Sequence, residues 1–136
     1  MMISFQSIGQ IKDYYAQIDS SRVHQIAPNF SISTLKGSII NLETLLEEDK
    51  TLVLNFWFPA CLPCIREFPS LNQLVEAYQG NDKVVFLAIS IIEQGVKSIA
   101  YHKRLQYQIA IDESREVANA YGIKTYPTNL IVDKKW

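Results

Sequence analysis

Apolar residues recur with two different periods along this chain, and the alternation of the two predicts strands and helices in turn. Residues 51–58 and 84–91 are nearly continuous apolar runs, as expected of strands buried on both faces of a sheet. Between them, residues 65–78 carry apolar side chains three and four positions apart, which indicates one face of a helix. Residues 128–132 form a further apolar run that predicts another strand. Strands that alternate with helices favour an α/β fold, with 51–58 and 84–91 paired in parallel across a right-handed crossover.

Weaker patterns surround this centre. The weaker elements that we expect are short strands near 30–32, 39–40 and 108–111 and short helices within 42–46, 93–105 and 113–121. Residues 8–20 also have helical apolar spacing, so we expect an amphipathic helix ahead of the main domain. The chain is therefore divided into a helical lead-in, residues 1–25, and one domain, residues 26–136. We expect Trp57 in the core of that domain and Tyr101 in ordinary packing contacts.

Length and composition permit one domain and give no sign of a charged partner. The chain has 136 residues, 48% of them hydrophobic, which is enough for one core and too little for two. The net charge is −1 and basic residues do not cluster, so a nucleic-acid or acidic-membrane partner has no electrostatic footprint. No apolar run approaches the roughly 20 residues of a transmembrane helix. Residues 1–6 lack the basic and then apolar order of a signal peptide, which leaves a cytoplasmic location open.

Cys61 and Cys64 are the only cysteines, and they stand between the apolar run and the amphipathic run. That order predicts strand, tight turn and helix, with Cys61 at the N-terminal mouth of the helix and Cys64 in its first turn. Unpaired backbone N–H groups and the helix dipole favour an anion there, and a thiolate is such an anion. The pKa of a cysteine falls from about 8.5 to roughly 3.5–7.5 in such surroundings. The pair is too small for a disulfide framework or a structural zinc site and instead predicts thiol–disulfide exchange.

A second motif, Tyr126-Pro127-Thr128, stands at the entry to the last apolar run. Because proline cannot donate to a strand ladder, Pro127 is expected at the first position of a strand, and after an aromatic residue it is a candidate for a cis bond. Together with the Cys-x-Pro-Cys turn, this motif resembles the thioredoxin-like fold. The closer resemblance is to the TlpA/ResA-type thiol–disulfide oxidoreductases. The segments that carry it are residues 27–30, 55–57, 61–69 and 126–128, within a similarity that covers about residues 26–136.

The resemblance implies a three-layer α/β sandwich around a central mixed β-sheet, preceded by an N-terminal helical extension. The family continues with a further strand and helix, and we expect this chain to lack both, since the sequence stops at Trp136. An exposed sheet edge would then allow pairing with a second copy as a homodimer. The resemblance also implies a redox domain, usually outside the cytoplasm, that exchanges disulfides with client proteins. We expect it to reduce client disulfides and not to form them. Its redox-active disulfide is the only cofactor expected, and a redox partner must regenerate it.

Each candidate site residue has a role and a plainer alternative. Cys61 is expected to be the more exposed cysteine and the nucleophile on a client disulfide, with Cys64 as the resolving thiol. Glu67 lies one helical turn after Cys64. In the family a glutamate at this spacing sits beneath the cysteine pair and influences its proton affinity; the alternative is a solvated glutamate on the helix surface.

The other candidate residues shape the client-binding surface. Pro63 restricts the turn between the cysteines, and in the family that position tunes the redox potential. Pro127 is expected to expose the backbone of Tyr126 to an extended client segment, with simple packing as the alternative role for the Tyr126 ring. Two departures from the pattern are Ala60, where the family commonly has tryptophan, and Asn55, where thioredoxin has a buried aspartate that carries protons.

Two rival functions remain open at this stage. The chain would be a binding module if the fold were retained for recognition and the cysteine pair were vestigial. A peroxiredoxin is disfavoured, because those enzymes need Thr or Ser three positions before the reactive cysteine and Phe58 stands there.

Overall fold

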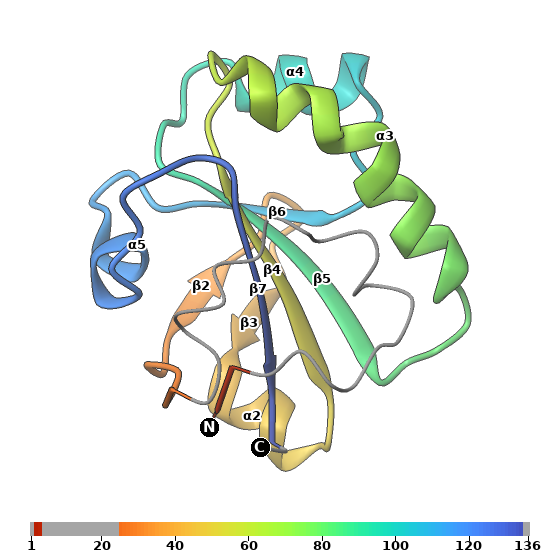
Figure 1. Cartoon of the computed structure of the whole chain (residues 1–136), viewed down its shortest axis with the longest axis vertical. Coiled ribbons are helices and arrows are strands. Elements are labelled where there is room, and N and C mark those ends of the chain that lie inside the picture. Colours follow the sequence, from red (N-terminus) through yellow and green to blue (C-terminus); the bar gives the residue numbers. More distant parts are fainter. Residues whose placement is uncertain (1, 4–24, 135–136) are drawn as a thin grey trace.

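The computed structural model describes residues 2–3 and 25–134 (Figure 1). Its strands are β1 (Met2–Ile3), β2 (Ser31–Ser33), β3 (Ile39–Asn41), β4 (Thr51–Trp57), β5 (Val84–Ser90), β6 (Gln108–Ile111) and β7 (Thr128–Asp133). Its helices are α2 (Leu42–Glu47), α3 (Leu62–Ala77), α4 (Val96–His102) and α5 (Glu116–Ala120). The expected α/β fold and the order of strands and helices are confirmed. The helix expected within residues 8–20 lies outside the described residues.

The central sheet is mixed and has the strand order β1-β7-β4-β5-β6. β4 pairs with β5 in parallel, with Asn55 opposite Ala88, as the apolar runs predict. β4 pairs with β7 antiparallel on its other side, and this register places Asn55 directly opposite Asn129. Because paired residues of an antiparallel ladder share a face of the sheet, these two amides are neighbours.

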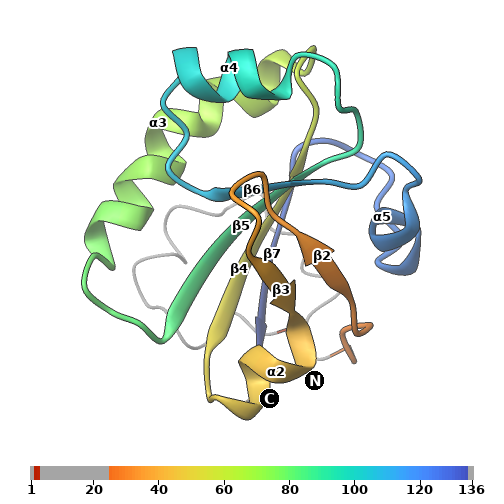
Figure 2. The ribbon, with the colours of Figure 1, turned by 180° about the vertical axis from the view of Figure 1, so that it is seen from behind.

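Each face of the sheet has its own hydrophobic cluster and its own covering elements (Figures 1 and 2). Alternate residues of β4 serve the two faces, so Leu54 belongs to one cluster and Val53 to the other. Helices α3 and α4 cover the face of Val53, where Phe68 and Trp57 pack edge to face with ring centroids 5.2 Å apart. The opposite face is covered by α2, α5 and the β2–β3 hairpin.

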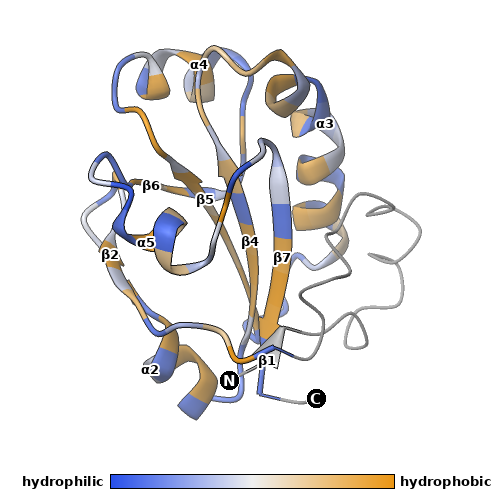
Figure 3. Cartoon of the chain, turned by 60° about the vertical axis from the view of Figure 1, so that its left-hand side comes forward, coloured by the Kyte–Doolittle hydropathy of each residue, from blue (hydrophilic) through white to orange (hydrophobic). Residues whose placement is uncertain are grey.

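Polar residues interrupt the apolar strands at one level of the sheet. Figure 3 shows blue segments in both β4 and β7, although most of each strand is coloured as hydrophobic. Asn55 and Asn129 supply this polarity and are 0% and 2% exposed. A buried amide destabilises the fold unless its polar atoms find partners, so this level of the sheet must contain a hydrogen-bond network.

Local sequence accounts for the ends of several elements. Asn41 caps α2, because its side-chain oxygen accepts the N–H of Thr44 at 2.9 Å. Gly122 follows α5 with a φ of 62°, in the left-handed region that suits a glycine after a helix. Trp57 is fully buried as expected. The expectation for Tyr101 is wrong: its side chain is 82% exposed, because α4 turns Val96 and Ala100 to the core instead.

The first residues of the chain belong to the sheet, which the sequence pattern does not predict. In β1, Met2 pairs with Asp133 and Ile3 with Val132, antiparallel to β7. The outer edge of β7 is therefore partly occupied. Among the described residues, no strand lies beside the remainder of that edge, at 128–131.

Candidate active site

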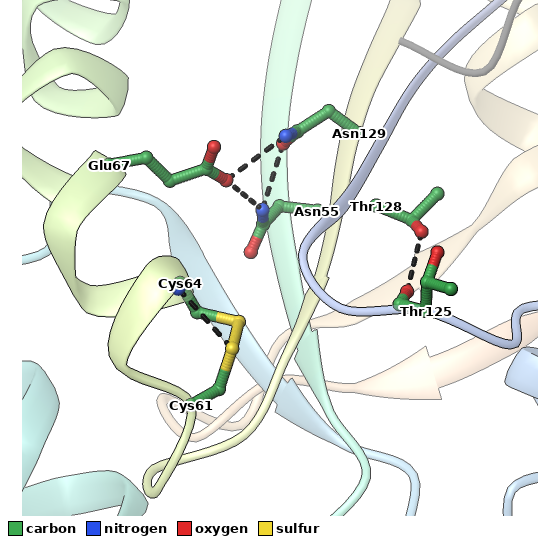
Figure 4. The surroundings of a disulfide bond; sticks show 7 residues. All are labelled: Asn55, Cys61, Cys64, Glu67, Thr125, Thr128 and Asn129. Carbon is green, nitrogen blue, oxygen red and sulfur yellow. Dashed lines mark hydrogen bonds between the residues drawn. A yellow bond between two sulfur atoms is a disulfide. The ribbon is translucent and has the colours of Figure 1, made fainter. Parts of the chain in front are cut away.

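Cys61 and Cys64 form a disulfide at the N-terminal end of α3, with their Cα atoms 5.3 Å apart (Figure 4). Cys61 precedes the helix in extended conformation, and Cys64 lies in the first turn. Their exposed fractions are 5% and 0%, so Cys61 is the sulfur that a second molecule can approach. Both the turn geometry and the order of exposure agree with the sequence analysis.

The start of α3 supplies electrostatic support for a thiolate. The Cys64 backbone N–H donates to the Cys61 sulfur at 3.2 Å, so Cys61 caps the helix with its own reactive atom. Pro63 stands at the second helical position, where its missing N–H removes no helical hydrogen bond. The dipole of the sixteen-residue helix adds partial positive charge at the same point. These features favour negative charge on Cys61 after the disulfide is reduced.

Glu67 lies on α3, one turn beyond Cys64, and points to the sheet instead of solvent (Figure 4). Its Oε1 accepts two hydrogen bonds, one from Asn55 Nδ2 and one from Asn129 Nδ2, each 3.0 Å long. Burial raises the pKa of the Glu67 carboxyl above its ordinary value, and the hydrogen bonds from Asn129 and Asn55 oppose that rise. Glu67 is therefore not the solvated surface residue of the plainer alternative.

Asn55 and Asn129 complete a closed network beneath the cysteine pair. Asn55 Nδ2 also donates to Asn129 Oδ1 at 2.8 Å, so the three side chains bond to one another in a triangle. Within the part of the chain that the structure describes, Asn55 Oδ1 is buried and accepts no hydrogen bond. Asn129 is a site residue that the sequence analysis missed; the available signal was an amide inside an apolar strand.

The Tyr126–Pro127 peptide bond is cis, as the sequence motif predicts, and it leads directly into β7. The Tyr126 ring packs edge to face on Phe58, with centroids 5.5 Å apart. Phe58 in turn accepts the Cys61 N–H through its backbone oxygen at 3.0 Å, which connects the Tyr126 loop to the cysteine turn. The Thr128 hydroxyl donates to the Thr125 carbonyl at 2.7 Å and closes the loop (Figure 4).

Apolar side chains lie next to the disulfide along the chain and in the contacts of the cysteine turn. Leu62, between the two cysteines, is 61% exposed, while Phe58 and Tyr126 are half-buried. Phe58 occupies the position where a peroxiredoxin needs a hydroxyl, so the structure gives Cys61 no such partner there.

Among residues 2–3 and 25–134, no three His, Cys, Asp or Glu side chains gather in a group that could hold a metal ion. The same residues contain no helix long and apolar enough to cross a bilayer.

Comparisons with known proteins agree with this geometry. The family model described as AhpC/TSA matches residues 23–136. The thiol–disulfide oxidoreductase ResA of Geobacillus thermodenitrificans is 34% identical over 124 residues, which cover 90% of this chain and 70% of that protein. ResA of Bacillus anthracis is 30% identical over 122 residues, which cover 89% of this chain and 69% of that protein.

Solved structures give the same fold. A thiol–disulfide oxidoreductase from Bacteroides fragilis superposes with a TM-score of 0.69 and 28% identity, over 79% of this chain and 82% of that one. StoA from Bacillus subtilis superposes with a TM-score of 0.68 and 24% identity, over 80% of this chain and 82% of that one. This chain thus shares its fold with thiol–disulfide oxidoreductases of known structure.

Proposed function

This chain belongs to the AhpC/TSA family and is a thioredoxin-like thiol–disulfide oxidoreductase, and we propose that it reduces disulfides in client proteins through Cys61 and Cys64. The observation that carries this proposal is the position of the disulfide. Its outer sulfur caps a helix, while its inner sulfur is fully buried one turn before a half-buried carboxyl.

In the proposed cycle, the Cys61 thiolate attacks one sulfur of a client disulfide. A mixed disulfide forms, and the other client sulfur leaves as a thiolate that takes a proton from solvent. The Cys64 thiol then loses its proton and attacks the Cys61 sulfur, which releases the second client thiol and restores the Cys61–Cys64 disulfide. Two electrons pass to the client, and the sulfur pair itself holds them, so the cycle requires no other cofactor.

Glu67 is proposed as the group that takes the Cys64 proton during the second step. Cys64 is fully buried, so solvent does not reach its sulfur, and the nearest carboxyl along the helix is that of Glu67. Burial raises the pKa of the Glu67 carboxyl, so this carboxylate is a stronger base toward the Cys64 proton than an ordinary glutamate is. Buried negative charge at Glu67 also disfavours a second negative charge on Cys64. This repulsion supports the disulfide over the dithiolate and hence the reducing direction.

Client binding is proposed at the loop formed by Tyr126 and Pro127. The loop contacts the cysteine turn through Phe58, and a client segment in extended conformation would pair with the Tyr126 backbone there. Pro63 and the exposed Leu62 form the other wall of this surface. A donor of two electrons must reduce the Cys61–Cys64 disulfide after each turnover. The proposed contact of any homodimer is the β7 edge at 128–131, beside which no strand of the described residues lies.

Two variants test this function. Cys64→Ser should accumulate a mixed disulfide between Cys61 and a client, visible on a non-reducing gel and absent from Cys61→Ser. The reduction potential, titrated against dithiothreitol or glutathione, should lie nearer to about −270 mV than to about −120 mV. A wild-type protein that shows no reversible two-electron couple would contradict the proposal and favour the binding module with a vestigial cysteine pair.

A further inference from the structure

We propose that Asn129 is a positioning residue of this site: together with Asn55 it clamps one oxygen of the Glu67 carboxyl group and fixes that group against the sheet, one helical turn beyond the buried Cys64. The inference rests on the proposed role of Glu67 as the partner of Cys64 in proton transfer. The clamp fixes the position of the Glu67 carboxyl group and influences its proton affinity.

The clamp is made by strands that bring distant parts of the chain together. Asn55 in β4 and Asn129 in β7 are paired residues of one antiparallel ladder, and both lie on the sheet face that α3 covers. Glu67 projects from α3 onto this pair, and both Nδ2 atoms reach its Oε1 at 3.0 Å (Figure 4). One helix and two strands therefore fix a single carboxylate oxygen.

The hydrogen bonds also determine which way each amide faces. Asn55 Nδ2 donates one hydrogen to Glu67 and the other to Asn129 Oδ1, which uses both hydrogens of that amide. Asn129 must then turn its Nδ2 to Glu67, because its oxygen is already the acceptor for Asn55. If either amide were reversed, an oxygen would face the carboxylate without a hydrogen between them. The triangle is thus self-consistent in one arrangement only.

The remaining oxygen of Asn55 indicates that the network serves more than folding. Asn55 Oδ1 is buried and lacks a donor among the described residues, which is unfavourable for the folded state. In Figure 4 this oxygen is turned away from Glu67 and Asn129, on the side of the cysteine pair. An apolar residue at position 55 would remove that unsatisfied acceptor, but it would also remove one of the two donors to Glu67.

The clamp acts on the charge state of Glu67 through neutral groups. The amides of Asn55 and Asn129 face it from β4 and β7. Cys61 and Cys64, at the start of α3, become titratable only after their disulfide is reduced. Donors to the carboxylate stabilise its ionised form, whereas burial stabilises its protonated form. Loss of the Asn129 donor should therefore make Glu67 hold its proton to higher pH.

The first test follows the carboxyl carbon of Glu67 by NMR during a pH titration of the oxidised protein, where no catalysis takes place. In Asn129→Leu the midpoint should rise by about one pH unit, a tenfold change in proton affinity, which is the effect of one lost donor. Asn129→Asp keeps the shape and the acceptor for Asn55 but adds a carboxyl group, so its midpoint should rise further. Asn119→Leu, on the exposed surface of α5, is the matched control and should leave the midpoint unchanged.

The second test is the pH profile of client-disulfide reduction. The acidic limb of the rate should move in Asn129→Leu by the same amount as the NMR midpoint, and it should not move when Glu67→Gln is already present. An unchanged midpoint in a folded Asn129→Leu protein would overturn the inference, and if that variant does not fold, the midpoint of Asn129→Asp decides in the same way. A Glu67→Gln profile identical to that of the wild type would overturn the role of Glu67 as well. Loss of activity in Cys61→Ser tests the oxidoreductase function separately.

Discussion

Reduction of the Cys61–Cys64 disulfide should lower the stability of the folded domain, by an amount that follows from the structure. The two cysteines are three positions apart, so the disulfide closes a loop of four residues. The loss of chain entropy in the unfolded state for so short a loop corresponds to about 2 kcal/mol in favour of the oxidised protein. This contribution is present only while the disulfide is closed.

An opposing contribution appears after reduction. The Cys61 sulfur caps α3 and accepts the Cys64 N–H, so a thiolate there interacts with the helix dipole. Such an interaction stabilises the reduced folded state by about 0.3–1 kcal/mol. The difference leaves the oxidised form more stable by about 1 kcal/mol. The reduction potential of the Cys61–Cys64 couple should therefore be about 20 mV lower than that of a cysteine pair in an unfolded chain.

The assay is guanidinium unfolding of the oxidised protein and of the protein kept reduced with dithiothreitol. The midpoint should be higher for the oxidised form, with similar slopes for the two transitions. A Cys61→Ser, Cys64→Ser double variant, unfolded with and without dithiothreitol, controls for effects of the reagent. An oxidant is instead more stable in its reduced form. If the reduced form of this protein were the more stable one by about 1 kcal/mol or more, both the reasoning from loop closure and the reducing direction would be refuted.

Three further predictions concern the core, the carboxyl group and the client surface. Phe68→Ala should lower the free energy of unfolding by about 3–5 kcal/mol, because the ring is 1% exposed and packs on Trp57; a loss below about 1 kcal/mol would contradict that packing. Burial raises the pKa of Glu67 in the folded chain, so the folded state binds the Glu67 proton more tightly than the unfolded state does. The resulting stabilisation is fully present below the pKa of the unfolded chain, about 4.3, and is lost as the pH rises through the pKa of the folded chain. Glu67→Gln should therefore flatten the fall of stability with rising pH, measured by denaturation at several pH values, and an undiminished fall would exclude Glu67 as its source. Tyr126→Ala should raise KM for a client peptide about tenfold or more while the reduction potential stays unchanged; the reverse pattern would place Tyr126 in the redox chemistry instead.

Local sequence is sufficient to predict those elements whose sequence patterns are strong and depend only on neighbouring residues. The apolar run at 51–58 predicts β4 because both of its faces are buried, and the Cys61 turn follows from its place between that run and the amphipathic helix. The cis bond before Pro127 is likewise predicted by its position at a strand entry. In each case the determining neighbours lie within a few positions along the chain.

The parts that escaped prediction depend on pairing between distant segments. The Asn129 role requires the register of β7 on β4, which brings it opposite Asn55, 74 positions away. The pairing of β1 involves only Met2 and Ile3, which are too few residues to show a period of two. The prediction for Tyr101 is wrong because α4 is short: Val96, Ile99 and Ala100 occupy its inner face, and the aromatic residue falls on the outer side.

The pairing of β1 with the end of β7 determines how this domain can be attached to anything else. Met2 lies opposite Asp133, so the two described ends of the chain leave the sheet at the same pole, next to the start of β4 (Figure 1). The disulfide follows the other end of β4, and a seven-residue strand spans about 20 Å. A linker, a fused domain or an electrode joined to either end would therefore hold the protein by the pole opposite its cysteines, with the Cys61 surface facing outward.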